Sequence, residues 1–229
     1  MKITIVVPVL NEAEFIRDFL SNLRERAAKA EIIVVDGGSS DGTAEYAVGI
    51  CDQLLRTAPG RALQMNAGAS RACGDVLWFL HADTRIPETA IVDIEVALKD
   101  SRVIGGFFRI RLTGRGFIYR LTDSFAHYAG LLLRIRYGDH GFFCRRQTFE
   151  KIGGFPEVSI MEDADFFRNL RRAGRVVVIP HPISVSPRRY ESIGPSRLTF
   201  AYGLIGLLYF FHAPRHLLHS IYRWACCRP

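Results

Sequence analysis

A chain of 229 residues with 48% hydrophobic and 23% charged residues can bury a sizeable core, and its composition excludes a disordered protein. The formal net charge of +7 favours anionic partners, such as phosphate groups or a lipid surface. The basic residues are scattered and no reader motif is present, so we expect no nucleic-acid partner.

The N-terminal sequence MKITIVVPVLNEAE does not resemble a signal peptide. Its apolar run is short, and the polar residues Asn11, Glu12 and Glu14 follow at once. The five cysteines are odd in number and lack metal-ligand spacing, which is typical of reduced thiols. We therefore expect a cytoplasmic protein.

Strands and helices alternate through the first hundred residues. Apolar runs rich in β-branched residues predict strands at residues 2–9, 31–36, 51–56 and 75–81. Helical spacing and helix-start signals predict helices at residues 11–30, 44–50, 61–72 and 87–100, the last with Pro87 at its start. Such alternation with continuous apolar strands predicts an α/β fold, in which a mostly parallel, doubly wound sheet has helices on both faces.

Polar residues at the carboxyl ends of the strands are the candidate site residues, because ligands of such sheets bind there. The first strand ends in PVLNE, and neither a dinucleotide fingerprint nor a P-loop is present. Asp36 ends the second strand and can accept hydrogen bonds from a ribose or a base. A turn capped by Asp41 explains GGSSDGT equally well. The fourth strand ends in FLHADT, which puts His81 and Asp83 at the same edge.

Four motifs in order resemble the family 2 glycosyltransferases, which have the GT-A fold: VVPVLNEAEFI, IIVVDGGSSDGT, GRALQMNAGASRACGDVLWFLHADT and MEDADFFRNLRRAGR. The resemblance covers residues 1–190 and implies a nucleotide-binding half at 1–85 and an acceptor half at 86–190. Residues 191–229 would then form a C-terminal apolar helical appendage. FLHADT, YGDHGFFCRR and RRY also resemble a bacterial subgroup of small stand-alone members, some of which are associated with arsenosugar biosynthesis.

The resemblance implies a set of residues that bind a nucleotide-diphosphate sugar: Pro8, Asn11, Glu12, Asp36, Gly37, Arg61, His81, Asp83, Arg188 and Arg189. In family members the last acid of an Asp-x-Asp motif contacts a divalent metal. Asp83 occupies that position, and His81 replaces the first acid. We expect Mg²⁺ or Mn²⁺ at Asp83 with His81 in support, although imidazole is a poor ligand for magnesium. A strand-end histidine without a ligand role and a capping role for Asp83 remain alternatives.

The segment MEDADFF places Glu162, Asp163 and Asp165 at the start of a predicted helix. Acids at a helix N-terminus are also ordinary residues that the helix dipole favours. The resemblance implies that Asp163 is the general base and that Glu162 is its neighbour at the acceptor site. Arg188 or Arg189 would contact the diphosphate, although either could equally be a solvated charge.

Residues 198–214 carry no charge and lie between Arg197 and Arg215. A membrane-spanning helix needs ~20 residues, so this stretch is marginal for that role. The alternatives are a helix packed in the core, a hairpin with RHLLHSIYR that binds the cytosolic membrane face peripherally, and a homodimer interface. In the second case, the acceptor could be lipid-linked.

The leading hypothesis is an inverting, metal-dependent glycosyltransferase that moves a sugar from a nucleotide-diphosphate sugar to an acceptor hydroxyl. A sugar-nucleotide pyrophosphorylase on a related fold is disfavoured, because its glycine- and arginine-rich loop after the first strand is absent. A membrane-associated nucleotide-sugar-binding protein without turnover is the third hypothesis. The sequence does not identify the sugar, the base or the acceptor.

Overall fold

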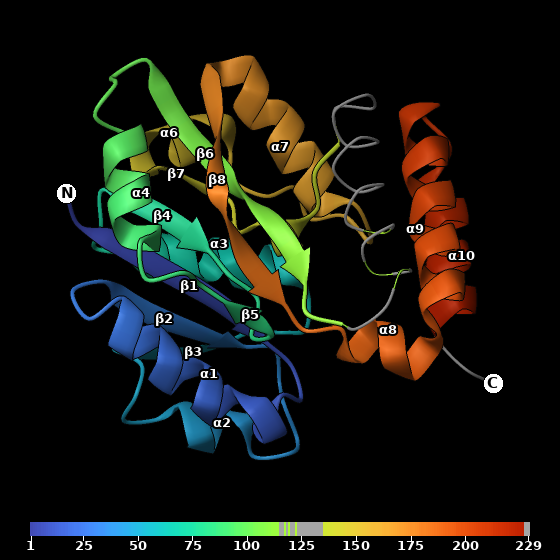
Figure 1. Cartoon of the computed structure of the whole chain (residues 1–229), viewed down its shortest axis with the longest axis horizontal. Coiled ribbons are helices and arrows are strands. Elements are labelled where there is room, and N and C mark those ends of the chain that lie inside the picture. The colour runs from blue at the N-terminus through green and yellow to red at the C-terminus, as the bar shows by residue number, and fades with distance from the viewer. Residues whose placement is uncertain (115–116, 118, 120–121, 123–134, 227–229) are drawn as a thin grey trace.

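The computed structural model describes the whole chain except residues 115–116, 118, 120–121, 123–134 and 227–229 (Figure 1). Eight strands among the described residues form one sheet, in the order β3-β2-β1-β4-β7-β6-β8-β5. Their bounds are β1 Ile3–Val9, β2 Glu31–Asp36, β3 Gln53–Arg56, β4 Val76–Phe79, β5 Thr84–Arg85, β6 Val103–Leu112, β7 Phe143–Arg145 and β8 Arg175–Val185.

Helices connect these strands and cover the sheet. Their bounds are α1 Ala13–Arg26, α2 Thr43–Ala47, α3 Arg61–Arg71, α4 Ala90–Ala97, α6 Arg146–Ile152, α7 Glu162–Ala173, α8 Arg188–Ile193, α9 Pro195–Phe210 and α10 Arg215–Cys226. A single 3-10 turn, η1, spans Gly138–His140 among the described residues.

The side chains of β1 alternate between two apolar cores, one on each face of the sheet. Ile5 and Val7 join a core that α1, α2 and α4 cover, whereas Val6 joins a core that α3, α6 and α7 cover. Successive strand side chains point to opposite faces, so a strand buried on both faces must be apolar throughout. The predicted α/β fold with helices on both faces is confirmed.

The sheet is mixed, and this decides what surrounds the end of β4. β1 to β4 are parallel to one another, but β7 runs antiparallel to both β4 and β6. β7 was not predicted, nor were β6 and β8. The predicted start of the fourth helix at Pro87 is wrong. A turn that the Ala90 N–H closes on the Pro87 carbonyl precedes α4, which begins at Ala90.

α9 and α10 stand side by side beyond one side of the sheet (Figure 1). They pack on the start of α7 through a third apolar cluster, which contains Ile135, Met161, Ala164, Ile205, Tyr209 and Leu218. The C-terminal helices therefore contact the segment that carries Asp163. Within the part of the chain that is described, no helix has both the length and the apolar character needed to cross a membrane.

Candidate active site

A hydrogen-bond network around Asp36 joins the carboxyl ends of β1 and β2. The buried Asp36 carboxylate accepts hydrogen bonds from the Ser39 N–H and hydroxyl. The Ser39 hydroxyl in turn accepts from the Asn11 N–H at 2.9 Å, and the Asn11 side chain accepts from the Ser40 N–H at 3.0 Å. Asn11 has a φ of 54°, a left-handed conformation in which asparagine is enriched. Two residues of the predicted set, Asn11 and Asp36, are therefore brought together.

The side chain of Gln64 in α3 links the ends of the same two strands. Its amide donates to the carbonyls of Val9 and Val35, at 2.8 Å each. A Cβ on Gly37 would lie 3.1 Å from this amide, so a side chain at position 37 would crowd the bridge. Pro8 is buried near the end of β1 in register with Val35. Gly37 and Pro8 therefore belong to the framework that supports the polar edge.

Asp41 holds the GGSSDGT turn in place. Its carboxylate accepts from the Thr43 N–H and hydroxyl and, at 3.0 Å, from the Ala13 N–H at the start of α1. The Glu12 N–H donates to the Thr43 hydroxyl oxygen at 2.7 Å. This turn therefore fixes the backbone at Glu12 and Ala13, and the capping role considered for Asp41 is confirmed.

Arg188, the first residue of α8, reaches Glu12 after the first strand. Its guanidinium donates to the Glu12 carboxylate and lies 4.5 Å from the centre of the Phe15 ring. Burial, the carboxylate of Asp139 and that of Glu12 raise the pKa of Asp83 to about 6, against the opposing charge of Arg188. Carboxylates from three distant parts of the sequence thus interact electrostatically near the end of β4.

His81 interacts electrostatically with a cation and an anion. Burial and the charge of Arg61 lower the pKa of His81 to about 4, so its ring is neutral near pH 7. The His81 Nε2 is 3.9 Å from Oδ1 of Asp139. Arg61 begins α3, and the carboxylates of Asp139 and Glu162 act on its charge. The structure therefore brings Arg61, His81 and Glu162 into one electrostatic neighbourhood.

Asp163 is a buried carboxylate at the start of α7, with only 7% of its surface exposed. Its Oδ2 accepts from the Gly138 N–H at 2.5 Å, and its Oδ1 accepts from the Ala164 N–H at 2.7 Å. Burial and the neighbouring Glu162 raise the pKa of Asp163 to about 7. A carboxylate with such a pKa exchanges protons near neutral pH, which suits a general base.

Aromatic packing and an amide clamp set the position of α7. The rings of Phe155 and Phe166 stack with their centroids 4.0 Å apart, and Phe79 of β4 meets Phe155 edge-on at 4.9 Å. The Asn66 side chain donates to the Phe155 carbonyl at 2.8 Å and accepts from the Phe155 N–H at 2.9 Å. These contacts tie the segment that leads into Asp163 to α3 and β4.

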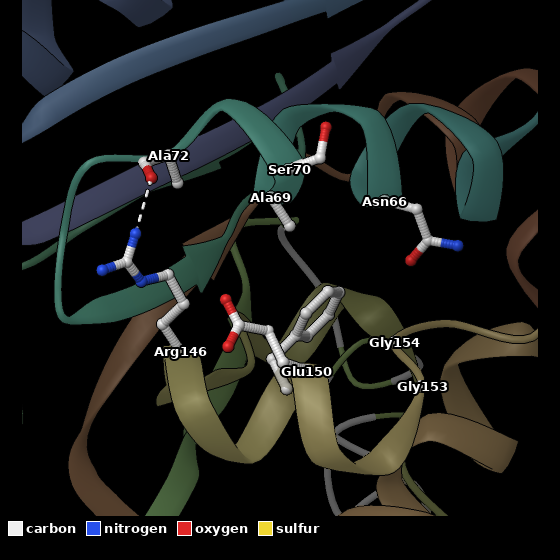
Figure 2. Close-up of a pocket in the computed structure, with 9 residues that line it drawn as sticks. Asn66, Ala69, Ser70, Ala72, Arg146, Glu150, Gly153 and Gly154 are labelled. Atoms are coloured by element: carbon white, nitrogen blue, oxygen red, sulfur yellow. Dashed lines mark hydrogen bonds between the residues drawn. The ribbon is translucent and has the colours of Figure 1, made fainter.

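A surface pocket of ≈ 350 Å³ lies between α3 and α6, next to the amide clamp (Figure 2). Figure 2 shows Asn66 and Glu150 on opposite walls, with the Arg146 guanidinium donating to the Ala72 carbonyl at the far end. None of the residues predicted to bind the donor or to act in catalysis lines this pocket. The pocket is therefore separate from the candidate active site.

A family model described as "Glycosyl transferase family 2" matches residues 4–156, more than half of the chain. The chain belongs to glycosyl transferase family 2. Solved structures agree with the expected GT-A fold. The mannosyltransferase PcManGT from Pyrobaculum calidifontis, in complex with GDP-Man and Mn²⁺, has a TM-score of 0.66 and 20% identity, over 97% of this chain and 68% of that one. Glucosyl-3-phosphoglycerate synthase from Mycobacterium tuberculosis, in complex with Mn²⁺, UDP and glucosyl-3-phosphoglycerate, has a TM-score of 0.65 and 18% identity, over 93% and 81%.

The chain also matches curated proteins by sequence, but it covers only part of their length. The protein MT1568 of Mycobacterium tuberculosis (strain CDC 1551 / Oshkosh) is 26% identical over 212 residues, which cover 80% of this chain and 66% of the relative. The poly-β-1,6-N-acetyl-D-glucosamine synthase of Staphylococcus aureus (strain COL) is 37% identical over 95 residues, which cover 38% of this chain and 23% of the synthase. This family 2 chain thus spans less than two thirds of either relative.

The donor atoms at the end of β4 fit a divalent metal that is shared with a substrate. No group of three or more His, Cys, Asp or Glu side chains within the described ranges is arranged to hold a metal alone. Mg²⁺ bound with phosphates needs only one or two protein carboxylates. Asp83 would provide one, and Asp139, whose Oδ1 lies 3.9 Å from the His81 Nε2, places a second carboxylate beside the same segment. Carboxylate oxygens suit Mg²⁺ and Mn²⁺ better than imidazole does.

Arg189 and Asp165 face the C-terminal helices. The Arg189 guanidinium donates to the Tyr222 hydroxyl and lies 5.2 Å from the centre of that ring, although its charge also acts on His81. Asp165 accepts from the Tyr209 hydroxyl at 2.6 Å and pairs with Arg215. Asp165 therefore joins α7 to α9 and α10, which is more than the helix-start role its sequence position suggested.

Sequence reasoning missed Gly138 and Asp139, although the motif that contains them was noted. Both lie in η1, directly before the antiparallel strand β7. A glycine and an acid after an aromatic residue are ordinary turn residues, so the motif alone gives no sign that the turn meets His81 or Asp163. The missing information was the direction of β7.

Proposed function

We propose that this family 2 chain is an inverting, metal-dependent hexosyltransferase that uses a nucleotide-diphosphate sugar and an acceptor hydroxyl. The observation that carries the proposal is Asp163, a buried carboxylate with a raised pKa. It accepts a hydrogen bond from the turn η1, whose next residue reaches His81. Asp163 accepts the acceptor's proton while the acceptor oxygen bonds to the sugar C1. The bond from C1 to the diphosphate oxygen breaks on the opposite side, and its electron pair leaves with the nucleoside diphosphate.

The remaining site residues divide into two groups by position. Asn11 and Asp36 form the edge that faces the nucleoside, with Gly37 and Pro8 as framework. Asp83, with His81 beside it in support, would hold a divalent cation, which supplies positive charge against the diphosphate when it is bound. Arg61 faces the same diphosphate. The two solved structures described above, which contain Mn²⁺ and a nucleotide, support this assignment by their shared fold.

Arg188 and Arg189 differ in how they would serve the diphosphate. Arg188 is engaged with Glu12 beside Asp83, so it supplies positive charge at the end of β4. Arg189 is engaged with Tyr222, and it links the site to α10. The three motifs FLHADT, YGDHGFFCRR and RRY support membership of the small stand-alone subgroup, which identifies neither donor nor acceptor.

The C-terminal helices present an exposed apolar surface for which we propose an anionic lipid membrane as partner. This hairpin surface consists of Phe200, Leu207, Phe210, Phe211, Leu217 and Trp224, all more than 40% exposed. No acidic residue follows Glu191 in the sequence, whereas four arginines do. Arg215 pairs with Asp165, but the segment as a whole keeps an excess of positive charge. Aromatic residues beside such an excess suit the boundary of an anionic leaflet. A lipid-linked acceptor would then lie near the enzyme.

A donor screen tests the activity. Purified protein is incubated with GDP-, UDP- and dTDP-sugars, with Mn²⁺ or with chelator, against a panel of hydroxyl acceptors and against water alone. Release of the nucleoside diphosphate is measured, with Asp163→Asn as the control. We expect metal-dependent release that the variant lacks. Tight binding of donor and metal without release from any combination would favour the binding protein without turnover.

A further inference from the structure

The turn η1 lies beyond the carboxyl end of β4 because β7 is antiparallel to that strand. Trp78 of β4 is in register with Phe143 at the start of β7, and the Phe79 N–H donates to the Phe142 carbonyl at 2.8 Å. The residues that precede Phe143 therefore extend past the end of β4 toward His81. The residues of η1 are consequently neighbours of the metal-binding edge, although more than fifty positions separate them in sequence.

Three contacts fix this turn. The Trp78 indole N–H donates to the Gly141 carbonyl at 3.2 Å, and the His140 Nδ1 lies 2.9 Å from the Phe108 carbonyl, to which it donates. The Gly138 N–H is held by Asp163. The turn is thus anchored on β4, β6 and α7 together. An anchored turn gives the one side chain between Gly138 and His140 a defined direction.

That side chain is Asp139, and it faces His81. Its Oδ1 is 3.9 Å from the His81 Nε2, and 48% of the side chain is exposed. A Cβ on Gly138 would lie 2.6 Å from the same nitrogen, so only glycine lets the turn approach this closely. A second carboxylate therefore stands beside the HAD segment, supplied by the turn η1 that precedes β7.

We propose that Asp139 is a ligand of the divalent cation together with Asp83. Asp139 then occupies the spatial position of the first acid of the Asp-x-Asp motif, whose place in the sequence His81 takes. The inference rests on the proposed metal-dependent function. Two carboxylates plus diphosphate oxygens form a ligand set of the kind that Mg²⁺ and Mn²⁺ prefer, whereas a carboxylate and an imidazole do not. His81 then lies beside Asp139, with its Nε2 3.9 Å from the Asp139 Oδ1, as a neighbour of the ligand and not as a ligand itself.

Metal binding is measured directly, without turnover. Free Mn²⁺ is followed by electron paramagnetic resonance in the presence of UDP or GDP, for wild type, Asp139→Asn and the matched control Asp18→Asn, an exposed acid on α1. We expect Asp139→Asn to weaken Mn²⁺ binding at least tenfold and Asp18→Asn to leave it unchanged. Thermal unfolding without metal should be the same for all three, because Asp139 is half exposed. Wild-type affinity in Asp139→Asn would overturn the proposal.

A change of ligand chemistry separates direct contact from positioning. Asp139→Cys should lose Mn²⁺ and gain Cd²⁺, with a thiolate-to-metal absorption band, because thiolates prefer soft metals. Asp18→Cys is the control for the native cysteines. A weakened Mn²⁺ affinity without this switch would make Asp139 a positioning residue and overturn its role as ligand. Failure of the proposed function looks different, since wild type would then bind Mn²⁺ with nucleotide but release no nucleoside diphosphate.

Discussion

The backbone N–H of Gly138 donates a 2.5 Å hydrogen bond to Oδ2 of Asp163, which couples the turn η1 to the start of α7. The next residue, Asp139, faces His81. One anchored turn therefore contacts both the proposed base and the proposed metal site. Because the hydrogen bond stabilises the charged carboxylate, it also limits how far burial raises the Asp163 pKa.

Replacement of Asp163 by asparagine should reduce kcat by ~10²–10⁴, the usual effect of removing a well-placed base. The asparagine amide can accept from only one of the Gly138 and Ala164 N–H groups, so its orientation also suffers. The affinity for the nucleotide part of the donor, measured by calorimetry with the nucleoside diphosphate and Mn²⁺, should stay nearly unchanged. Glu162→Gln is the matched control and should be milder. Near-normal turnover in Asp163→Asn would place the base elsewhere, with Glu162 as the first candidate.

The raised pKa of Asp163 predicts an acid limb in the pH profile. Below about pH 7 the carboxyl group is protonated and cannot accept the acceptor's proton, so kcat/KM should fall about tenfold per pH unit. Above about pH 7 the profile should level. Kinetics between pH 5 and 9 measure this, with circular dichroism to confirm that the fold persists. A limb near pH 4, the ordinary range of aspartate, would contradict the assignment.

The same shift predicts how stability depends on pH. Between about pH 4 and about pH 7 the folded protein keeps the Asp163 proton, while the unfolded chain has lost it. The folded state therefore binds more protons, so this group's stabilising contribution is complete below about pH 4 and is lost as the pH rises through about 7. Without divalent cation, the Tm of wild type should fall more steeply over that interval than the Tm of Asp163→Asn.

Much of the fold could be predicted from the sequence, because β1, β2 and β4 are buried on both faces and read as continuous apolar runs. β6 and β8 could not be predicted in the same way. Both carry exposed and half-buried positions among their apolar residues, and β8 contains two prolines. β7 has only three residues, too few for a periodic pattern. The second half of the sheet depends on pairing between distant segments.

The candidate site likewise contains residues that local sequence predicts and contacts that depend on distant segments. Asp36 ends a predicted strand, and Asn11 and Asp83 come shortly after two others, so their shared edge follows from the parallel arrangement. The pairing of Arg188 with Glu12 joins residues 176 positions apart, and no local pattern announces it. Asp163 was found through a motif in the family resemblance. Its hydrogen bond to Gly138 depends on the unpredicted direction of β7.

Asp165 should contribute to stability rather than to catalysis. Its carboxylate accepts from the Tyr209 hydroxyl and pairs with Arg215, while largely shielded from solvent. Asp165→Ala leaves two donors without their charged partner, so the free energy of unfolding should fall by about 1–3 kcal/mol in urea denaturation. Asp18→Ala on α1 is the control. A loss of turnover at a temperature where Asp165→Ala remains folded would instead place this residue in the chemistry.

The hairpin surface should bind anionic membranes through its aromatic residues. Phe211 and Trp224 are 69% and 61% exposed, so insertion at the lipid boundary would remove much apolar area from water. Wild type should sediment with phosphatidylglycerol vesicles and not with phosphatidylcholine vesicles, and added salt should weaken the binding because the arginines contribute. The double variant Phe211→Ser/Trp224→Ser should bind about tenfold or more weakly, which corresponds to a loss of about 1.4 kcal/mol or more.

The matched control for this surface is Val92→Ser/Val96→Ser, which removes two exposed apolar side chains of α4. It should bind vesicles like wild type if the hairpin surface is the membrane-binding site. Equal loss in both double variants would indicate nonspecific adsorption. Light scattering of each protein without lipid tests whether the hairpin surface instead forms a dimer. A wild-type dimer that Phe211→Ser/Trp224→Ser converts to a monomer, together with no vesicle binding, would make the hairpin surface a subunit interface, and the acceptor would then need no lipid.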